Sequence, residues 1–139
     1  MYKKIVVGYD GSDPARDAVE QAVDLATATG SSVHLVTAVG KNDKVVRMGE
    51  SSDTQFLSES EIARRNLKDL ATNYRHLDIS FEAVPGSPAK VLVGEAKSVD
   101  ADLILVGNRH VQGIGRVLGS VAEDVAHNAP CAVLIAKTT

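Results

Sequence analysis

The feature that most constrains the fold of this chain is a regular alternation of short apolar segments with longer amphipathic ones. The short segments are β-branched and aliphatic, as buried parallel strands require, and the longer ones carry apolar residues at helical spacing. This pattern predicts a doubly wound α/β fold, an α/β/α sandwich in which helices cover both faces of a five-stranded, mostly parallel sheet of order 3-2-1-4-5. The expected strands are Lys4–Tyr9, Val33–Val39, Asp78–Val84, Leu103–Val106 and Ala132–Ala136.

Helix-boundary residues agree with this alternation. Asp13 is expected to cap the first helix, with Pro14 at a position that needs no amide hydrogen and Gly30 at the end. Ser120 and Glu123 have the spacing of a capping box, which predicts that Ser120 caps the last helix.

One segment does not follow the alternation. Residues 40–55 are polar and without periodicity, so they are expected to form a mobile loop, followed by a helix from about Phe56 to Tyr74. Repeats, low-complexity tracts and linkers are absent from the sequence, and a single domain spanning residues 1–139 is expected.

Charge and composition exclude several classes of protein. The 15 Lys and Arg against 18 Asp and Glu give a net charge of −3, which offers no electrostatic reason to bind nucleic acid or an anionic membrane. Apolar runs fall short of the roughly 20 residues that span a bilayer. Cys131 is the sole cysteine, so an internal disulfide is excluded. The expected location is cytoplasmic.

The candidate site follows from the predicted topology. Ligands of such sheets bind at the carboxyl ends of neighbouring strands whose connections go to opposite faces, here the first and fourth. Asp10-Gly11-Ser12 follows the first strand, and the glycine-rich segment 107–120 follows the fourth and leads into a helix. A helix N-terminus reached in this way suits an anion. The alternative is that Gly119-Ser120 is only a turn and a cap, and that Asp10 is only a turn-forming residue.

Two stretches resemble the universal stress protein family. They are KKIVVGYDGS at the N-terminus and ADLILVGNRH…GIGRVLGSVAEDVAHNAPCAVLIAK at the C-terminus, and the likeness extends over essentially the whole chain. The resemblance implies an adenine nucleotide alpha hydrolase-like fold that binds ATP, or else ADP or AMP, with Mg²⁺. It also implies a homodimer formed through the last strand, whose Ala132–Ile135 segment is uniformly apolar.

The resemblance also implies which residues hold the nucleotide. In ATP-binding members a Gly-x2-Gly-x9-Gly-Ser/Thr pattern surrounds the phosphates, and Gly107, Gly119 and Ser120 match it. His110 replaces the second glycine, and eight residues rather than nine separate it from Gly119. The full set implied to bind the nucleotide is Asp10, Gly11, Ser12, Val39, Val106, Gly107, His110, Gly119, Ser120 and Val121.

Other chemistries fit the sequence less well. The glycines from Gly113 to Gly119 hint at a dinucleotide fingerprint, but they follow the fourth strand and lack the acidic residue about 20 positions on. A P-loop motif is absent. The histidines His34, His76 and His127 lack metal-ligand spacing, and Cys131 is expected in the core.

Two classes of function therefore remain, with a third from the family. The first is a nucleotide-binding regulator in stress response, favoured because the sequence offers a phosphate cradle without an evident general base. The second is a slow ATPase or phosphotransfer protein that uses Asp10 and Mg²⁺. The third is an ATP-independent scaffold for protein–protein interaction.

Overall fold

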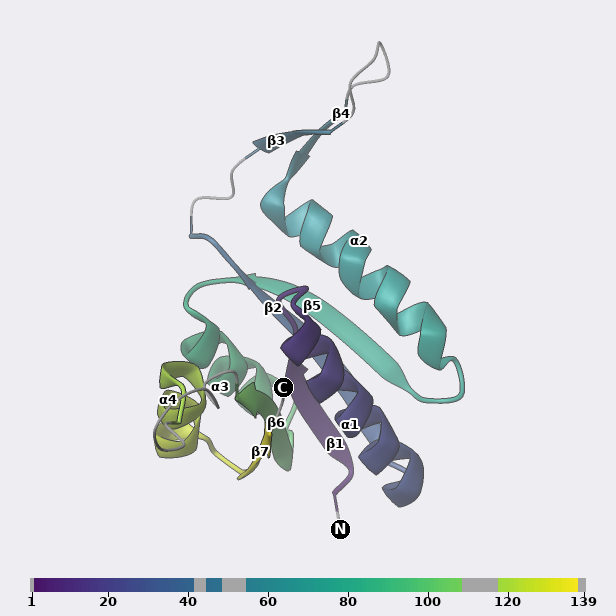
Figure 1. Ribbon diagram of the computed structural model, residues 1–139, viewed down its shortest axis with the longest axis vertical. Coiled ribbons are helices and arrows are strands. Elements are labelled where there is room, and N and C mark those ends of the chain that lie inside the picture. The colour runs from purple at the N-terminus through teal and green to yellow at the C-terminus, as the bar shows by residue number, and fades with distance from the viewer. Residues whose placement is uncertain (1, 42–44, 49–54, 109–117, 138–139) are drawn as a thin grey trace.

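The computed structural model contains the five-stranded parallel sheet that the sequence predicts. It describes residues 2–41, 45–48, 55–108 and 118–137. The strands lie in the order β5-β2-β1-β6-β7, which is the expected order 3-2-1-4-5 once the sheet strands are numbered by themselves. All four neighbouring pairs are parallel (Figure 1). Their bounds are Lys4–Gly8 (β1), Ser32–Val39 (β2), Ile79–Pro85 (β5), Leu103–Asn108 (β6) and Ala132–Lys137 (β7).

Helices cover both faces of this sheet because alternate strand residues point to opposite sides. Ile5 and Val7 of β1 belong to one core cluster, with residues of α1 (Asp13–Thr29) and α2 (Glu59–Ala71). Val6 belongs to the other cluster, with residues of α3 (Pro88–Ser98) and α4 (Ser120–Asn128). Each cluster excludes water from one face of the sheet, and together they supply the main apolar burial of the fold.

Two predicted helix caps are wrong by one residue. Ser12, not Asp13, caps α1, because Ser12 has an extended backbone and its Oγ accepts the Ala15 amide at 3.2 Å. At α4 the cap is Gly119, whose carbonyl accepts the Glu123 amide at 2.9 Å, so Ser120 is already helical and the predicted capping box does not form. Gly30 ends α1 as expected, at a φ of 72° that favours glycine. Within the described residues, no helix combines the length and apolarity needed to cross a bilayer.

The segment between β2 and α2 also differs from the prediction. Val45–Met48 (β3) and Gln55–Ser58 (β4) pair as an antiparallel hairpin where a loop was expected. The second helix accordingly begins at Glu59 rather than near Phe56, and a short 3-10 helix, η1 (Thr72–Tyr74), follows it. In Figure 1 the hairpin lies beyond the first turn of α2, away from the five-stranded sheet. The two strands are only four residues long and stand among polar residues, so their apolar pairs are too short to show a periodicity in the sequence.

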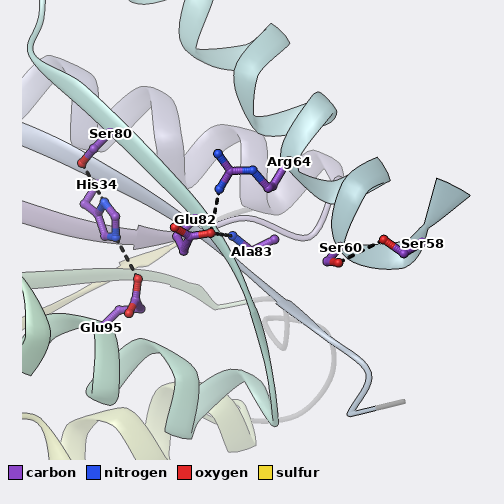
Figure 2. Close-up of polar contacts among 8 residues, drawn as sticks. All are labelled: His34, Ser58, Ser60, Arg64, Ser80, Glu82, Ala83 and Glu95. Atoms are coloured by element: carbon purple, nitrogen blue, oxygen red, sulfur yellow. Dashed lines mark hydrogen bonds and ion pairs between the residues drawn. The ribbon is translucent and has the colours of Figure 1, made fainter. Parts of the chain in front are cut away.

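A buried histidine joins three elements on the α3 side of the sheet. His34 lies on β2 and is 6% exposed. Its Nδ1 lies 2.7 Å from Oγ of Ser80 on β5, and its Nε2 lies 3.0 Å from Oε1 of Glu95 on α3 (Figure 2). Both ring nitrogens therefore have partners, as a buried imidazole requires. His34 is a structural residue here, in agreement with the sequence expectation.

Candidate functional site

A cavity of about 420 Å³ lies at the carboxyl ends of β1, β2 and β6. β1 and β6 are neighbours in the sheet. β1 continues into α1 on one face, whereas β6 is followed by α4 on the other. The cavity thus occupies the point where the connections diverge, which is where doubly wound sheets bind ligands and where the sequence analysis placed the site.

Most of the residues predicted for the site line this cavity. They are Asp10, Ser12, Val106, Gly107, Gly119, Ser120 and Val121. Val39 is not among the lining residues, and its carbonyl accepts the Gly86 amide at 2.9 Å, while the neighbouring Ala38 contributes to the wall. Gly11 lines a different cavity, described below, and His110 falls outside the described residues.

The β1–α1 connection forms the acidic side of the cavity. Asp10 Oδ1 accepts hydrogen bonds from the Ser12 amide at 3.0 Å and from the Ser12 hydroxyl at 2.5 Å. The turn between them passes through Gly11 at a φ of 83°, a conformation that glycine adopts at little cost. Asp10 therefore has the turn-forming role that was one of its two alternatives, and it also lines the cavity.

The opposite side of the cavity is the N-terminus of α4. The first amides of any helix lack acceptors within that helix, and they carry the positive end of the helix dipole. In α4 the amide of the cap residue, Gly119, donates to Oδ1 of Asn108 at 3.0 Å. The next positions, Ser120 and Val121, lie in the cavity wall. Among the described lining residues Asp10 alone carries a charge, so backbone amides are the evident anion-binding groups there.

An apolar slot completes the cavity. Val36 of β2 is 1% exposed, and Val91 and Leu92 of α3 are each 5% exposed. Gly8 at the end of β1 allows α3 to come close, because a Cβ at that position would lie 3.3 Å from the Leu92 methyl groups. Apolar walls with a few polar groups at one end are typical of small-molecule sites. A ligand with a flat apolar ring and an attached anion would match this cavity, with the ring in the apolar slot and the anion at the N-terminus of α4.

Sequence reasoning missed Asn108 and the apolar slot. The signal for Asn108 was present, because alternation along β6 places it on the same face as Ile104 and Val106. The slot residues of α3 carried no such signal, since Val91 and Leu92 look like any core residues of an amphipathic helix. Only the approach of α3 to Gly8 shows that they border a cavity.

A second cavity, of about 710 Å³, lies on the other side of the β1–α1 turn. Its walls come mainly from α1, α2 and the end of β1, and Tyr9 and Asp10 border both cavities. Arg16 of α1 donates to the Tyr9 hydroxyl at 3.4 Å. Burial raises the pKa of Tyr74, and the carboxylate of Glu20 raises it further. Charged residues such as Arg16 and Glu20 line the second cavity beside apolar ones, so its walls are mixed in polarity.

Two other candidate chemistries can be placed in the structure. Burial raises the pKa of the Cys131 thiol, which lowers its thiolate fraction and makes it a poor nucleophile. Within the part of the chain that the structure describes, no cluster of three or more His, Cys, Asp or Glu side chains is arranged to hold a metal ion.

Comparison with known proteins agrees with this architecture. The model of the universal stress protein family matches residues 1–137. The chain belongs to the universal stress protein family. A universal stress protein of Methanocaldococcus jannaschii is 34% identical over an alignment 142 positions long, which covers 99% of this chain and 83% of the relative.

Solved universal stress proteins share the fold over nearly the full chain. One, described as a complex with cAMP, has a TM-score of 0.73 and 33% identity, and the match covers 99% of this chain and 98% of that one. Another, from Archaeoglobus fulgidus and described as a complex with dAMP, has a TM-score of 0.69 and 26% identity, covering 96% and 97%. Adenine nucleotides are thus ligands of proteins with this fold and related sequence.

Proposed function

We propose that this universal stress protein binds an adenine nucleotide in the cavity at the ends of β1 and β6 and acts as a nucleotide-dependent regulator. The observation that carries the proposal is the pairing of an apolar slot with a helix N-terminus inside one cavity. Relatives described with cAMP and dAMP support the choice of adenine. The cavity volume of about 420 Å³ also lies within the usual range for small-molecule sites.

Each part of the nucleotide has a matching part of the cavity. The adenine ring would lie in the slot formed by Val36, Val91 and Leu92, where it loses contact with water. The phosphate would lie at the first turn of α4, near Ser120 and Val121. Asp10, across the cavity, would accept a hydrogen bond from the ribose.

ATP with Mg²⁺ remains the ligand expected from the glycine pattern, and it is the finer part of this proposal. Mg²⁺ prefers carboxylate and phosphate oxygens and keeps several waters. With Mg²⁺ bound, Asp10 would contact the ion in place of the ribose, because it is the charged side chain among the described lining residues. AMP and ADP fit the same slot and helix N-terminus.

Thermal unfolding with added nucleotide tests the proposal. A ligand at 100 times its dissociation constant stabilises the native state by about 2.7 kcal/mol, which raises the melting temperature of a domain this size by several degrees. We expect this shift with ATP and Mg²⁺, with AMP and with cAMP, and a smaller one with GMP, which has the same phosphate but another base. Absence of any shift at millimolar adenine nucleotide would overturn the proposal.

A pair of glycine substitutions makes the test specific to the cavity. Gly119→Leu introduces a bulky side chain at a wall residue whose φ of −64° suits any amino acid, so it should abolish the shift without backbone strain. Gly94→Leu adds the same side chain on α3, where a Cβ would have no atom within 4 Å, and should leave the shift unchanged. Equal shifts in both variants would place the nucleotide elsewhere.

The proposal also includes the homodimer and the cytoplasmic location expected from the sequence. β7 is the last strand of the sheet order, and its Leu134 and Ile135 side chains are 37% and 36% exposed. Antiparallel pairing with a second copy of β7 would cover this edge and satisfy its backbone groups.

Slow ATP hydrolysis is the second candidate activity. Phosphate release that is lost in Asp10→Asn would favour it over binding alone.

A further inference from the structure

Asn108 lies at the end of β6, where the chain leaves the sheet. Alternation along β6 places it on the same face as Val106, and it lines the cavity. Its Oδ1 accepts the amide of Gly119 at 3.0 Å, across 11 positions of sequence. Because an amide nitrogen can only donate, this bond fixes which end of the Asn108 carboxamide faces α4.

This bond determines how α4 begins. Gly119 has no side chain with which to cap the helix, and no side-chain bond caps the first turn locally. Asn108 supplies an acceptor from the sheet instead, so the helix start is held against β6. The amides of Ser120 and Val121, which follow, lack acceptors within the helix. Their direction relative to the cavity is therefore set by the Asn108–Gly119 bond.

The chemistry of the acceptor matters as much as its position. A carboxamide oxygen accepts the Gly119 amide without adding charge. A carboxylate of the same shape would accept it too, but would place a negative charge at the wall where α4 meets the cavity. Coulomb repulsion between such a charge and a bound phosphate would grow with the number of phosphate charges.

We propose that Asn108 is the positioning residue for the phosphate of the bound nucleotide: it aims the first amides of α4 into the cavity and keeps that wall uncharged. This inference rests on the proposed function and adds to it a residue that sets preference by phosphate charge. Asn108 acts through Gly119 and the following amides.

Two variants measured with three ligands test the role. Asn108→Ala removes the acceptor, and Asn108→Asp keeps it but adds charge. Titration calorimetry with adenosine, AMP and ATP then separates base binding from phosphate binding. For Asn108→Ala we expect adenosine to bind within about twofold of the parent and AMP to bind about five- to tenfold more weakly, the effect of one hydrogen bond.

Asn108→Asp distinguishes positioning from mere support of the fold. It should match the parent in melting temperature and in adenosine affinity, yet weaken AMP about tenfold and ATP more than AMP. The loss should shrink as salt is raised, because screening weakens charge repulsion. Equal losses for adenosine, AMP and ATP would mean that Asn108 only supports the fold, and unchanged affinities in both variants would also overturn the inference.

Hydrogen exchange at the Gly119 amide gives a readout that needs no ligand. Protection should be present in the parent, lost in Asn108→Ala and retained in Asn108→Asp, and unprotected exchange in the parent would overturn the inference by itself. A parent with a protected Gly119 amide that binds none of the three ligands would instead overturn the proposed function, and the phosphate role of Asn108 with it.

Discussion

Asp102 anchors the first residues of the chain to the sheet. Its Oδ2 accepts the Lys3 amide at 2.8 Å, and its Oδ1 accepts the Lys4 amide at 3.1 Å. Partial burial acts to raise the pKa of the Asp102 carboxyl, but the hydrogen bonds from Lys3 and Lys4 outweigh it and hold the pKa below its ordinary value of 3.8. The ionised carboxylate is therefore the form that stabilises the native state.

A pH-dependent loss of stability follows from this shift. Because the native pKa is the lower one, the contribution of Asp102 is complete above the ordinary value of 3.8 and is lost as pH falls through the native pKa. Asp102→Asn should lower the free energy of unfolding by about 1 kcal/mol at pH 7, a modest value because the group is largely solvated. Urea unfolding at pH 7 and at pH 3 should show the difference from the parent shrinking on the acid side.

Asp124→Asn is the matched control for this prediction. It makes the same change in charge at an exposed position of α4. Its effect on stability should stay within about 0.5 kcal/mol at both pH values. A gap for Asp102→Asn that is equally large at pH 7 and pH 3 would contradict the pKa argument.

At the scale of elements, the His34–Glu95 contact joins β2 to α3 across 61 positions of sequence. Removing Glu95 leaves a buried imidazole nitrogen without its partner, which costs about 1–3 kcal/mol. Glu95→Ala should therefore lower the free energy of unfolding by that amount. A double-mutant cycle with His34→Ala should give a coupling energy of about 0.5–3 kcal/mol.

The chain contains a surface counterpart that serves as control. His127 Nε2 and Glu123 Oε1 lie 4.0 Å apart on α4, with side chains 73% and 59% exposed. Glu123→Ala should change stability by less than about 0.5 kcal/mol, because exposed pairs contribute little. Equal effects at Glu95 and Glu123 would show that burial does not strengthen the inner contact.

Replacing glycine by alanine should have opposite effects on stability at two positions, Gly30 and Gly94. Gly30 ends α1 at a φ of 72°, so Gly30→Ala should destabilise the protein by about 1 kcal/mol through backbone conformation, although a Cβ there has no atom within 4 Å. Gly94 lies inside α3 with equally open surroundings. Gly94→Ala should stabilise the protein by about 0.5–1 kcal/mol. Thermal unfolding of both variants checks the signs, and a shared sign would refute the argument.

At the scale of the whole molecule, the exposed edge strand β7 leads us to expect a homodimer. Leu134 and Ile135 are partly exposed on the last strand of the sheet, which leaves apolar surface beside an open edge. Light scattering at tens of micromolar protein should give the mass of a dimer. Ile135→Lys should shift the equilibrium to monomer, because a charge would be buried in the pairing of the two edges.

Asn73→Lys is the control for Ile135→Lys. It adds the same charge in η1, a region remote in sequence from β7. It should leave the protein dimeric. A parent that scatters as a monomer at this concentration would contradict the proposed assembly.

The sequence alone determined the order of the strands in the five-stranded sheet, the helices between them and the location of the candidate site. Apolar β-branched runs encode parallel strands locally, and the order of strands and helices restricts the sheet to few topologies. That was enough to bring Asp10, Ser12, Gly107 and Ser120 together, although they lie in two segments separated by most of the chain. The universal stress protein motifs lie at the same point of the sheet.

Only the tertiary structure decided which residues cap the helices, line the cavities and contact one another between distant elements. Gly119 is the cap of α4, and its amide donates to Asn108 at the end of β6, 11 positions away in sequence. Gly11 lines the second cavity from the β1–α1 turn. Ala38 rather than Val39 lines the first cavity, because successive strand residues face opposite sides of the sheet. His34 found Glu95 through the packing of α3. The local pattern of apolar and polar residues specifies whether a segment forms a strand or a helix. Contacts between distant segments depend instead on how the helices pack against the sheet.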